Sequence, residues 1–143
     1  MAELKTIVLV VDDEIKLCQA LSRVLANAGY RVYIAHDGES ALKEVKEQKP
    51  IVVLLDLMMP GRNGREVCRD IRRLSPLTRV IYFTARAEAT GPPELKELRA
   101  EADAVIAKPA TSARILAEVK RVIQERPPVK KAVRSQSTMK FKE

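Results

Sequence analysis

The sequence predicts an α/β domain in which helices cover both faces of a parallel sheet. Short runs of aliphatic and β-branched residues alternate five times with longer segments of helical periodicity. Residues 51–55 contain no polar side chain, which is typical of a strand with helices on both sides. Helices that connect consecutive strands let those strands run parallel, so their carboxyl ends meet at one edge of the sheet. Ligands of such sheets bind beyond that edge, and the pattern therefore also predicts where a site would form.

The strands are predicted from runs rich in valine, isoleucine and leucine. In chain order they cover residues 6–11, 31–35, 51–55, 79–84 and 104–107. Beyond the alternation of strand and helix, the sequence shows no internal repeat and no second domain.

The helices are predicted from apolar residues that recur on one face of each longer segment. They cover residues 14–28, 39–48, 64–74, 93–100 and 112–125. Gly29 is a fitting end for the first helix, and Pro93 fits the first turn of the fourth. The residues expected to face inward are Leu17, Leu21, Val24 and Leu25 in the first helix, Ala41, Leu42 and Val45 in the second, and Ile115, Leu116, Val119 and Ile123 in the last.

The composition restricts the classes of function. With 143 residues, 46% of them hydrophobic, the chain can bury a core, and we expect one domain over residues 1–125. No apolar stretch approaches the roughly 20 residues that span a membrane, and the first residues do not read as a signal peptide. Cys18 and Cys68 lack a paired spacing and are expected to be free thiols in a reducing cytoplasm. One histidine and two distant cysteines argue against zinc.

The positive charge is concentrated at one end of the chain. Of the net charge of +7, five charges belong to residues 126–143, which contain six basic residues and one acidic residue. This segment follows Pro127-Pro128 and lacks periodicity, so a disordered tail is expected. Such a tail could touch nucleic acid or an acidic partner, although most basic tails are simply solvated.

Polar side chains follow four of the predicted strands. Asp12 and Asp13 follow the first strand, Asp56 the third and Lys108 the fifth, and Thr84 ends the fourth. If these strands lie side by side and parallel, three carboxylates, a hydroxyl and an ammonium share one pocket.

Clustered carboxylates without histidine or thiolate suit a hard cation, for which Mg²⁺ is the natural candidate. The Lys108 ammonium and the Thr84 hydroxyl suit a phosphate-like anion. A carboxylate beside Mg²⁺ and lysine can act as the nucleophile of phosphoryl transfer and form an aspartyl phosphate.

Each of these residues also has a simpler interpretation. Asp12 or Asp13 could cap the helix that follows, and Asp56 could be a strand-end charge paired with Lys108. Thr84 alone is unremarkable, and a solitary Lys-Pro is usually a surface loop. The functional interpretation depends on the five residues occurring together at the ends of four strands.

At these positions the chain resembles the receiver domain of two-component response regulators over residues 5–125. The matching segments are Val10–Glu14, Leu54–Gly61, Asn63-Gly64, Phe83–Ala85, and Ala102–Ala104 leading to Lys108-Pro109. No single segment is decisive, but the ordered set is specific. The resemblance implies a flavodoxin-like sheet with strand order 2-1-3-4-5.

The resemblance also implies the roles of the site residues. Asp56 would accept a phosphoryl group from a phosphohistidine. The ligands of Mg²⁺ would be Asp13, Asp56 and the backbone carbonyl of Met58, with Asp12 helping through a water molecule.

The phosphoryl group would be bound by three further residues, Thr84, Lys108 and the backbone N–H of Ala85. In this family the peptide between Lys108 and Pro109 is typically cis.

The implied partners are a sensor histidine kinase or phosphotransfer protein and a downstream protein. The downstream protein would bind the face made by the fourth helix, fifth strand and fifth helix, with homodimerisation as a further option. Such a chain is a switch rather than a conventional enzyme, because it catalyses only its own phosphorylation and dephosphorylation. No membrane insertion is expected.

The chain departs from the family pattern at four places. Val105 stands where many relatives have an aromatic residue, and Glu101 replaces a usual glycine. Ala110 follows Lys108-Pro109 in place of a common Phe, and residues 86–93 form a slightly long connection. We therefore expect the chemistry of the pocket to be retained, whereas the structural response that reaches the output surface should be unusual.

Two other functions remain open at this stage. The chain could be the receiver part of a DNA-binding regulator whose output domain is absent, or could use its basic tail on DNA. It could also be an aspartyl-phosphate phosphohydrolase. Those enzymes usually carry a second Asp two residues after the nucleophile, where this chain has Met58, which argues against the enzyme.

Overall fold

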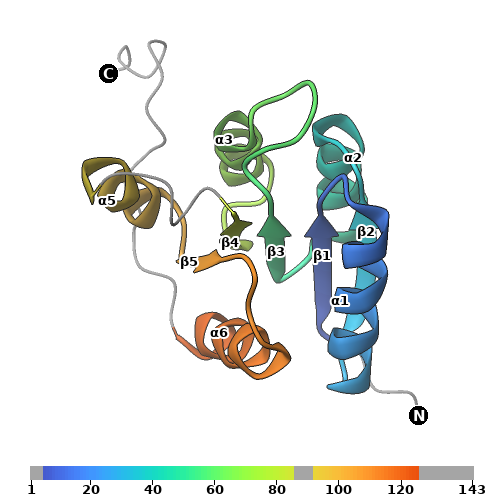
Figure 1. The fold of residues 1–143 in the computed structure, drawn as a ribbon. Coiled ribbons are helices and arrows are strands. Elements are labelled where there is room, and N and C mark those ends of the chain that lie inside the picture. Colours follow the sequence, from blue (N-terminus) through green and yellow to red (C-terminus); the bar gives the residue numbers. More distant parts are fainter. Residues whose placement is uncertain (1–4, 86–91, 126–143) are drawn as a thin grey trace.

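The computed structural model describes residues 5–85 and 92–125, in which a five-stranded parallel sheet lies between two layers of helices (Figure 1). The strands are β1 (Ile7–Val11), β2 (Arg31–Ala35), β3 (Val52–Leu55), β4 (Arg79–Thr84) and β5 (Ala104–Ala107). The helices are α1 (Ile15–Asn27), α2 (Gly38–Gln48), α3 (Gly64–Leu74), α5 (Pro92–Glu101) and α6 (Ser112–Gln124). The order β2-β1-β3-β4-β5 confirms the predicted fold, and each predicted element ends within one residue of the observed one.

The helices divide between the two faces of the sheet. Buried residues of α1 and α6 form one core layer, and those of α2, α3 and α5 form the other. Successive side chains of a strand point to opposite faces. On β4, Ile81 and Phe83 therefore pack with α1 and α6, whereas Val80 and Tyr82 pack in the layer of α2, α3 and α5.

The strand register brings the strand ends to one level. Val11 at the end of β1 is paired with Ala35 of β2 and with Leu55 of β3. The ladder continues one residue further, because Asp12 N–H donates to the Ala35 carbonyl and Asp56 N–H donates to the Val11 carbonyl. The first residues after β1 and β3 are therefore neighbours at the carboxyl edge.

Local sequence signals fix the ends of several helices. The side chains of Asp37, Asn63 and Thr111 accept hydrogen bonds from backbone N–H groups in the first turns of α2, α3 and α6. Such caps typically stabilise a protein by about 0.5–2 kcal/mol. Gly29 follows α1 with a φ of 102°, the left-handed conformation that glycine adopts readily. This confirms the predicted helix end.

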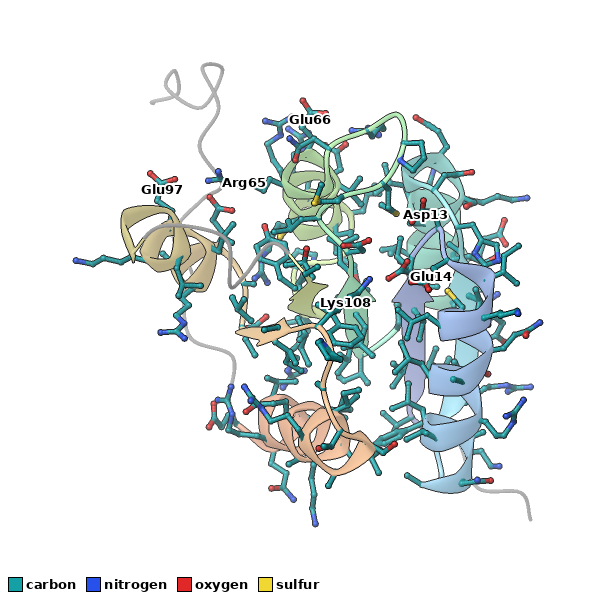
Figure 2. All side chains as sticks on the ribbon, in the orientation of Figure 1. Asp13, Glu14, Arg65, Glu66, Glu97 and Lys108 are labelled. Atoms are coloured by element: carbon teal, nitrogen blue, oxygen red, sulfur yellow. The ribbon has the colours of Figure 1, made fainter. Side chains whose placement is uncertain are left out.

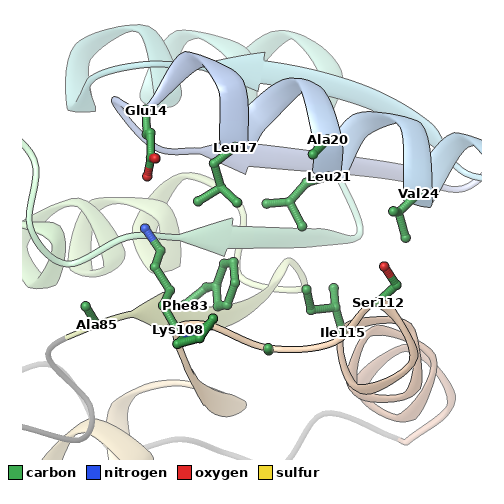
Figure 3. A pocket seen from close by; sticks show the side chains of 12 residues that line it. Glu14, Leu17, Ala20, Leu21, Val24, Phe83, Ala85, Lys108, Ser112 and Ile115 are labelled. Carbon is green, nitrogen blue, oxygen red and sulfur yellow. The ribbon is translucent and has the colours of Figure 1, made fainter.

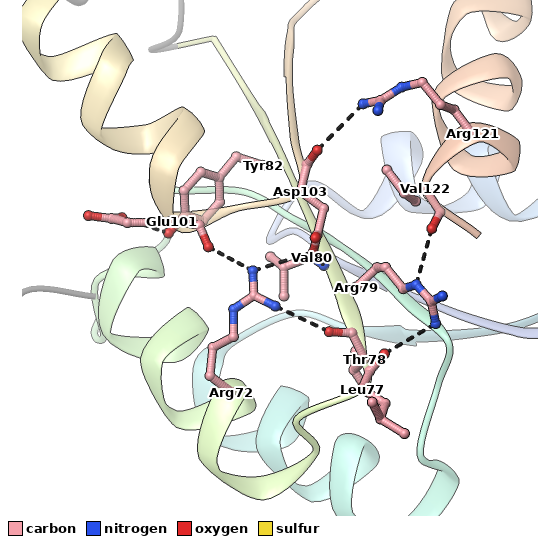
Figure 4. Close-up of polar contacts among 10 residues, drawn as sticks. All are labelled: Arg72, Leu77, Thr78, Arg79, Val80, Tyr82, Glu101, Asp103, Arg121 and Val122. Atoms are coloured by element: carbon pink, nitrogen blue, oxygen red, sulfur yellow. Dashed lines mark hydrogen bonds and ion pairs between the residues drawn. The ribbon is translucent and has the colours of Figure 1, made fainter. Parts of the chain in front are cut away.

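Arg79 at the start of β4 holds the end of α6. Its guanidinium donates to the carbonyls of Val122, Ile123 and Glu125, with the shortest distance, 3.1 Å, to Val122 (Figure 4). The last carbonyls of a helix have no partner within the helix, so these bonds satisfy them. Val122 is buried, although the helical periodicity did not single it out as an inward residue.

Several predictions drawn from composition can be compared with the structure. Cys18 and Cys68 are buried free thiols, as predicted. Within the described residues, no helix has both the length and the apolarity needed to cross a membrane. The predicted disordered tail at residues 126–143 lies outside the described residues, as does the connection over residues 86–91.

Gly64 provides a test of the packing at the start of α3. A Cβ at this position would lie 2.6 Å from the Leu57 Cα and 2.7 Å from the Asp56 carbonyl oxygen, both backbone atoms. We expect Gly64→Ala to lower the free energy of unfolding by about 1–3 kcal/mol because the backbone must shift. Urea unfolding measures this change. The control Lys43→Ala, at an exposed position of α2, should stay within about 0.5 kcal/mol of the wild type.

Candidate functional site

Three carboxylates meet at the carboxyl edge of the sheet. Asp12, Asp13 and Asp56 each offer an oxygen, and these oxygens all lie within 4.8 Å of one another. Asp12 and Asp56 are only 2% and 6% exposed, whereas Asp13 is exposed. Like charges at this separation repel, and burial strengthens the repulsion. The predicted acidic cluster is therefore present, and a hard divalent cation fits its oxygen donors.

Lys108 provides the opposite charge. It follows β5 (Figure 2). Its ammonium lies 2.6 Å from Asp12 Oδ2 and 3.5 Å from Asp56 Oδ2. The ammonium also lies 5.5 Å from the centroid of the Phe83 ring, within range of a cation–π contact. The peptide between Lys108 and Pro109 is cis, as expected. Burial alone would lower the pKa of Lys108, but the hydrogen bond to Asp12 and the charge of Asp56 raise it above its ordinary value.

The surroundings of the Asp56 carboxylate disfavour its ionised form. Burial raises its pKa above the ordinary value, and the neighbouring Asp12 charge adds to the increase. The Met58 N–H, the Lys108 ammonium and the Thr84 side chain oppose the increase without cancelling it. The Met58 N–H lies 3.2 Å from Asp56 Oδ1. An additional cation next to this carboxylate would reduce the free-energy cost of burying its negative charge.

The remaining predicted site residues are also near Asp56. Thr84 is fully buried at the end of β4, and its side chain lowers the pKa of Asp56. Ala85, the next residue, is exposed. Met58, two residues after Asp56, is 54% exposed. The structure thus brings together the residues that the strand ends predicted.

Asp12 is not a helix cap. The residue that caps α1 is Glu14, whose side chain makes no capping hydrogen bond. Asp12 Oδ1 instead accepts the Glu14 N–H at 3.0 Å, and Oδ2 accepts from Lys108. Asp12 is therefore not the N-cap residue of α1; its side chain joins the backbone just before this helix to Lys108.

His36 lies directly after β2, at the edge of the sheet that carries the acidic cluster. Its ring is exposed, but Nδ1 lies 2.9 Å from the Asp12 carbonyl oxygen, to which it donates. The Cys18 thiol lies 3.3 Å from the same oxygen. His36 follows β2, the neighbour of β1, so the strand-end rule applied to β2 would have drawn attention to it. The backbone of Asp12 is thus held from two sides.

An apolar groove of about 430 Å³ begins beside Lys108 and runs between α1 and α6 (Figure 3). Leu17, Leu21 and Val24 line it from α1, and Ile115 lines it from α6. Because Lys108 borders this open volume, its side chain can move without displacing core residues.

The comparisons with known proteins agree with this geometry. Residues 8–120 match the model of the response regulator receiver domain. The chain therefore belongs to this family, whose members are phosphorylation-dependent signalling switches of two-component systems rather than conventional enzymes.

Solved structures of the same family resemble the chain over most of its length. The Vibrio cholerae chemotaxis protein CheY4 is 31% identical, with a TM-score of 0.75, and the match covers 83% of this chain and 99% of that one. The beryllofluoride-activated DrrB receiver domain is 33% identical, with a TM-score of 0.73 and coverage of 85% and 100%. A Burkholderia pseudomallei response regulator with a phosphorylated aspartic acid and a calcium ion is 28% identical, with a TM-score of 0.71 and coverage of 79% and 65%.

The raised pKa of Asp56 predicts how stability depends on pH. The folded carboxyl binds its proton more tightly than the unfolded one, so the charge of Asp56 destabilises the fold once the pH exceeds the ordinary Asp value of 3.8. We expect Asp56→Asn to melt a few degrees above the wild type at pH 7 without Mg²⁺. The difference should close as the pH falls towards 3.8.

Asp37 is the matched control, because its hydrogen bonds with Ser40 lower the pKa of its carboxyl. Asp37→Asn should therefore give no increase in melting temperature at pH 7. An Asp56→Asn variant that melts below the wild type at pH 7 would contradict the electrostatic account.

His36 predicts a second change, in Mg²⁺ affinity. His36→Leu removes the N–H donor to the Asp12 carbonyl and should weaken Mg²⁺ binding about two- to tenfold, the equivalent of one net hydrogen bond. His36→Asn keeps a donor at the position of Nδ1 and should bind Mg²⁺ like the wild type. Titration followed by the melting temperature distinguishes the two variants. Equal affinities in both variants would show that this hydrogen bond does not position Asp12.

Proposed function

We propose that Asp56 accepts a phosphoryl group from the phosphohistidine of a sensor histidine kinase or a phosphotransfer protein. The observation that carries this proposal is the acidic cluster with Lys108 inside it, at the carboxyl edge of the sheet. Asp56 is buried in this cluster, and the Lys108 ammonium, which suits a transferring anion, lies 3.5 Å from its Oδ2. The phosphorylated aspartic acid of the Burkholderia pseudomallei relative supports the same chemistry here.

The donor set of the cluster fits Mg²⁺. Asp13, Asp56 and the Met58 backbone carbonyl would hold the ion, with Asp12 acting through a water molecule. Burial raises the pKa of Asp56, and a cation bound at this carboxylate would oppose that increase. When bound, Mg²⁺ would neutralise charge on the oxygens of the transferring group.

In the reaction, an Asp56 oxygen forms a bond to phosphorus while the bond from phosphorus to the donor's imidazole nitrogen breaks. The imidazole leaves with the electron pair of that bond and takes up a proton from solvent. The Thr84 hydroxyl and the Ala85 N–H then donate to the phosphoryl oxygens, and Lys108 pairs with them. Lys108 can turn from Asp12 to the phosphoryl group because the groove beside it leaves space.

The phosphorylated chain is proposed to change its binding to a downstream protein. The surface for this response is the face made by α5, β5 and α6, which adjoins the site through Thr84 and Lys108. A second copy of the chain is an alternative partner for that face. Both thiols are buried and free, which supports a reducing compartment such as the cytoplasm.

Phosphorylation tests this function directly. With acetyl phosphate and Mg²⁺, intact mass spectrometry should show one phosphoryl group on the wild type and none on Asp56→Asn. Chelation of Mg²⁺ should prevent the adduct. Lys108→Ala should still gain stability from Mg²⁺ but lose the conformational response to phosphorylation. An adduct that persists in Asp56→Asn, or that forms without Mg²⁺, would overturn the proposal.

A further inference from the structure

A buried carboxylate ends α5. Glu101 is the last residue of α5 and is only 3% exposed. Arg65 of α3 donates to both of its oxygens, through Nε at 2.9 Å from Oε1 and through Nη2 to Oε2. The Tyr82 hydroxyl of β4 donates to Oε1 at 3.0 Å. A buried charge is tolerated only while it is paired, so Glu101 depends on these two residues.

The first of these partners is connected to the backbone of Asp56. Gly64 N–H donates to the Leu57 carbonyl at 3.3 Å, and the first turn of α3 lies directly on the backbone of Asp56 and Leu57. Arg65 is the next residue of α3, and it reaches across to Glu97 as well as Glu101 of α5 (Figure 2). Arg65 therefore links the backbone after Asp56 to the side chains of α5.

The second partner is connected to Thr84. Tyr82 and Thr84 are two residues apart on β4, so their side chains point to the same face. Tyr82 is fully buried, and burial raises the pKa of its hydroxyl, which therefore stays protonated and can donate. Its register partner on β5 is Val105, the position where many relatives have an aromatic residue. In this chain the aromatic ring at this level of the sheet is that of Tyr82 on β4, and the Tyr82 hydroxyl contacts Glu101 of α5.

A separate set of contacts fixes the backbone where α5 meets β5. Arg72 of α3 donates to the Glu101 carbonyl at 2.7 Å and to Asp103 Oδ2 at 3.3 Å (Figure 4). Asp103 Oδ2 also accepts the Val80 N–H at 2.9 Å. These bonds lie towards the opposite edge of the sheet from Asp56 and do not involve the Glu101 side chain. They leave α5 anchored at its last turn, whether or not Glu101 is paired.

We propose that Glu101 is the residue through which the state of Asp56 is transmitted to α5, and that Arg65, Tyr82 and Glu101 form a clamp on this helix. The clamp has two states because a buried carboxylate that loses one partner is better placed in water. Movement of Thr84 and of the backbone after Asp56 towards a phosphoryl group weakens both contacts. Glu101 then turns out to solvent, and α5 tilts about the contacts of Arg72. This inference rests on the proposed phosphorylation of Asp56.

Hydrogen exchange of α5 tests the clamp, with beryllofluoride and Mg²⁺ as the phosphoryl mimic. In the wild type we expect exchange over residues 95–101 to become several-fold faster when the mimic binds. Tyr82→Phe removes only the hydroxyl, and Arg65→Gln removes the charge of the other partner. Both variants should show the faster exchange without the mimic and a smaller further change with it. Arg73→Gln, an exposed arginine of the same helix, should behave like the wild type.

The remaining outcomes separate a clamp from general destabilisation and from failure of the proposed function. Exchange in α1 is the internal reference, because a merely destabilised variant would exchange faster there as well. If both Tyr82→Phe and Arg65→Gln exchange like the wild type while Asp56 is phosphorylated normally, the clamp is overturned and the proposed function stands. If the wild type takes up no phosphoryl group or mimic, the proposed function fails and the clamp as a transmitter fails with it.

Discussion

The structure depends on a close balance of charge at one edge of the sheet. Asp12 and Asp56 are almost inaccessible to water, lie on adjacent strands, and share the ammonium of Lys108. One cation lies beside two buried anions and the exposed Asp13, and burial raises the pKa of Asp56 above its ordinary value. The site is therefore most stable when another positive charge, or a group that reorganises these charges, is present.

This balance explains why the surrounding contacts are numerous. The Asp12 backbone is held by His36 and Cys18, and the Asp56 side chain by the Met58 N–H and Thr84. Each contact fixes a group that would otherwise move away from its like-charged neighbour. The fold supplies this support from four strands, because parallel strands end level at the same edge.

The sequence predicts the fold and the central site well because both follow from local patterns. Apolar runs and helical periodicity define the elements, and the polar residues that end the runs are brought together by topology alone. The strand-end rule points to His36 but does not predict its contact with Asp12, and it says nothing of the pairing of Arg65 with Glu101. The latter joins residues 36 positions apart on two helices, and it depends on side-chain directions that no local pattern encodes. Glu101 was visible only as a departure from the usual glycine, without an indication of its partners.

The bonds between Arg79 and the end of α6 have a consequence for how the domain can be attached to other units. They hold the last turn of α6 at the amino edge of the sheet, whereas Asp56 lies beyond the carboxyl edge. Glu125, the last described residue, therefore lies on the side of the domain opposite the acidic cluster. The end of α6 and a kinase that docks over Asp56 make independent demands on the surface.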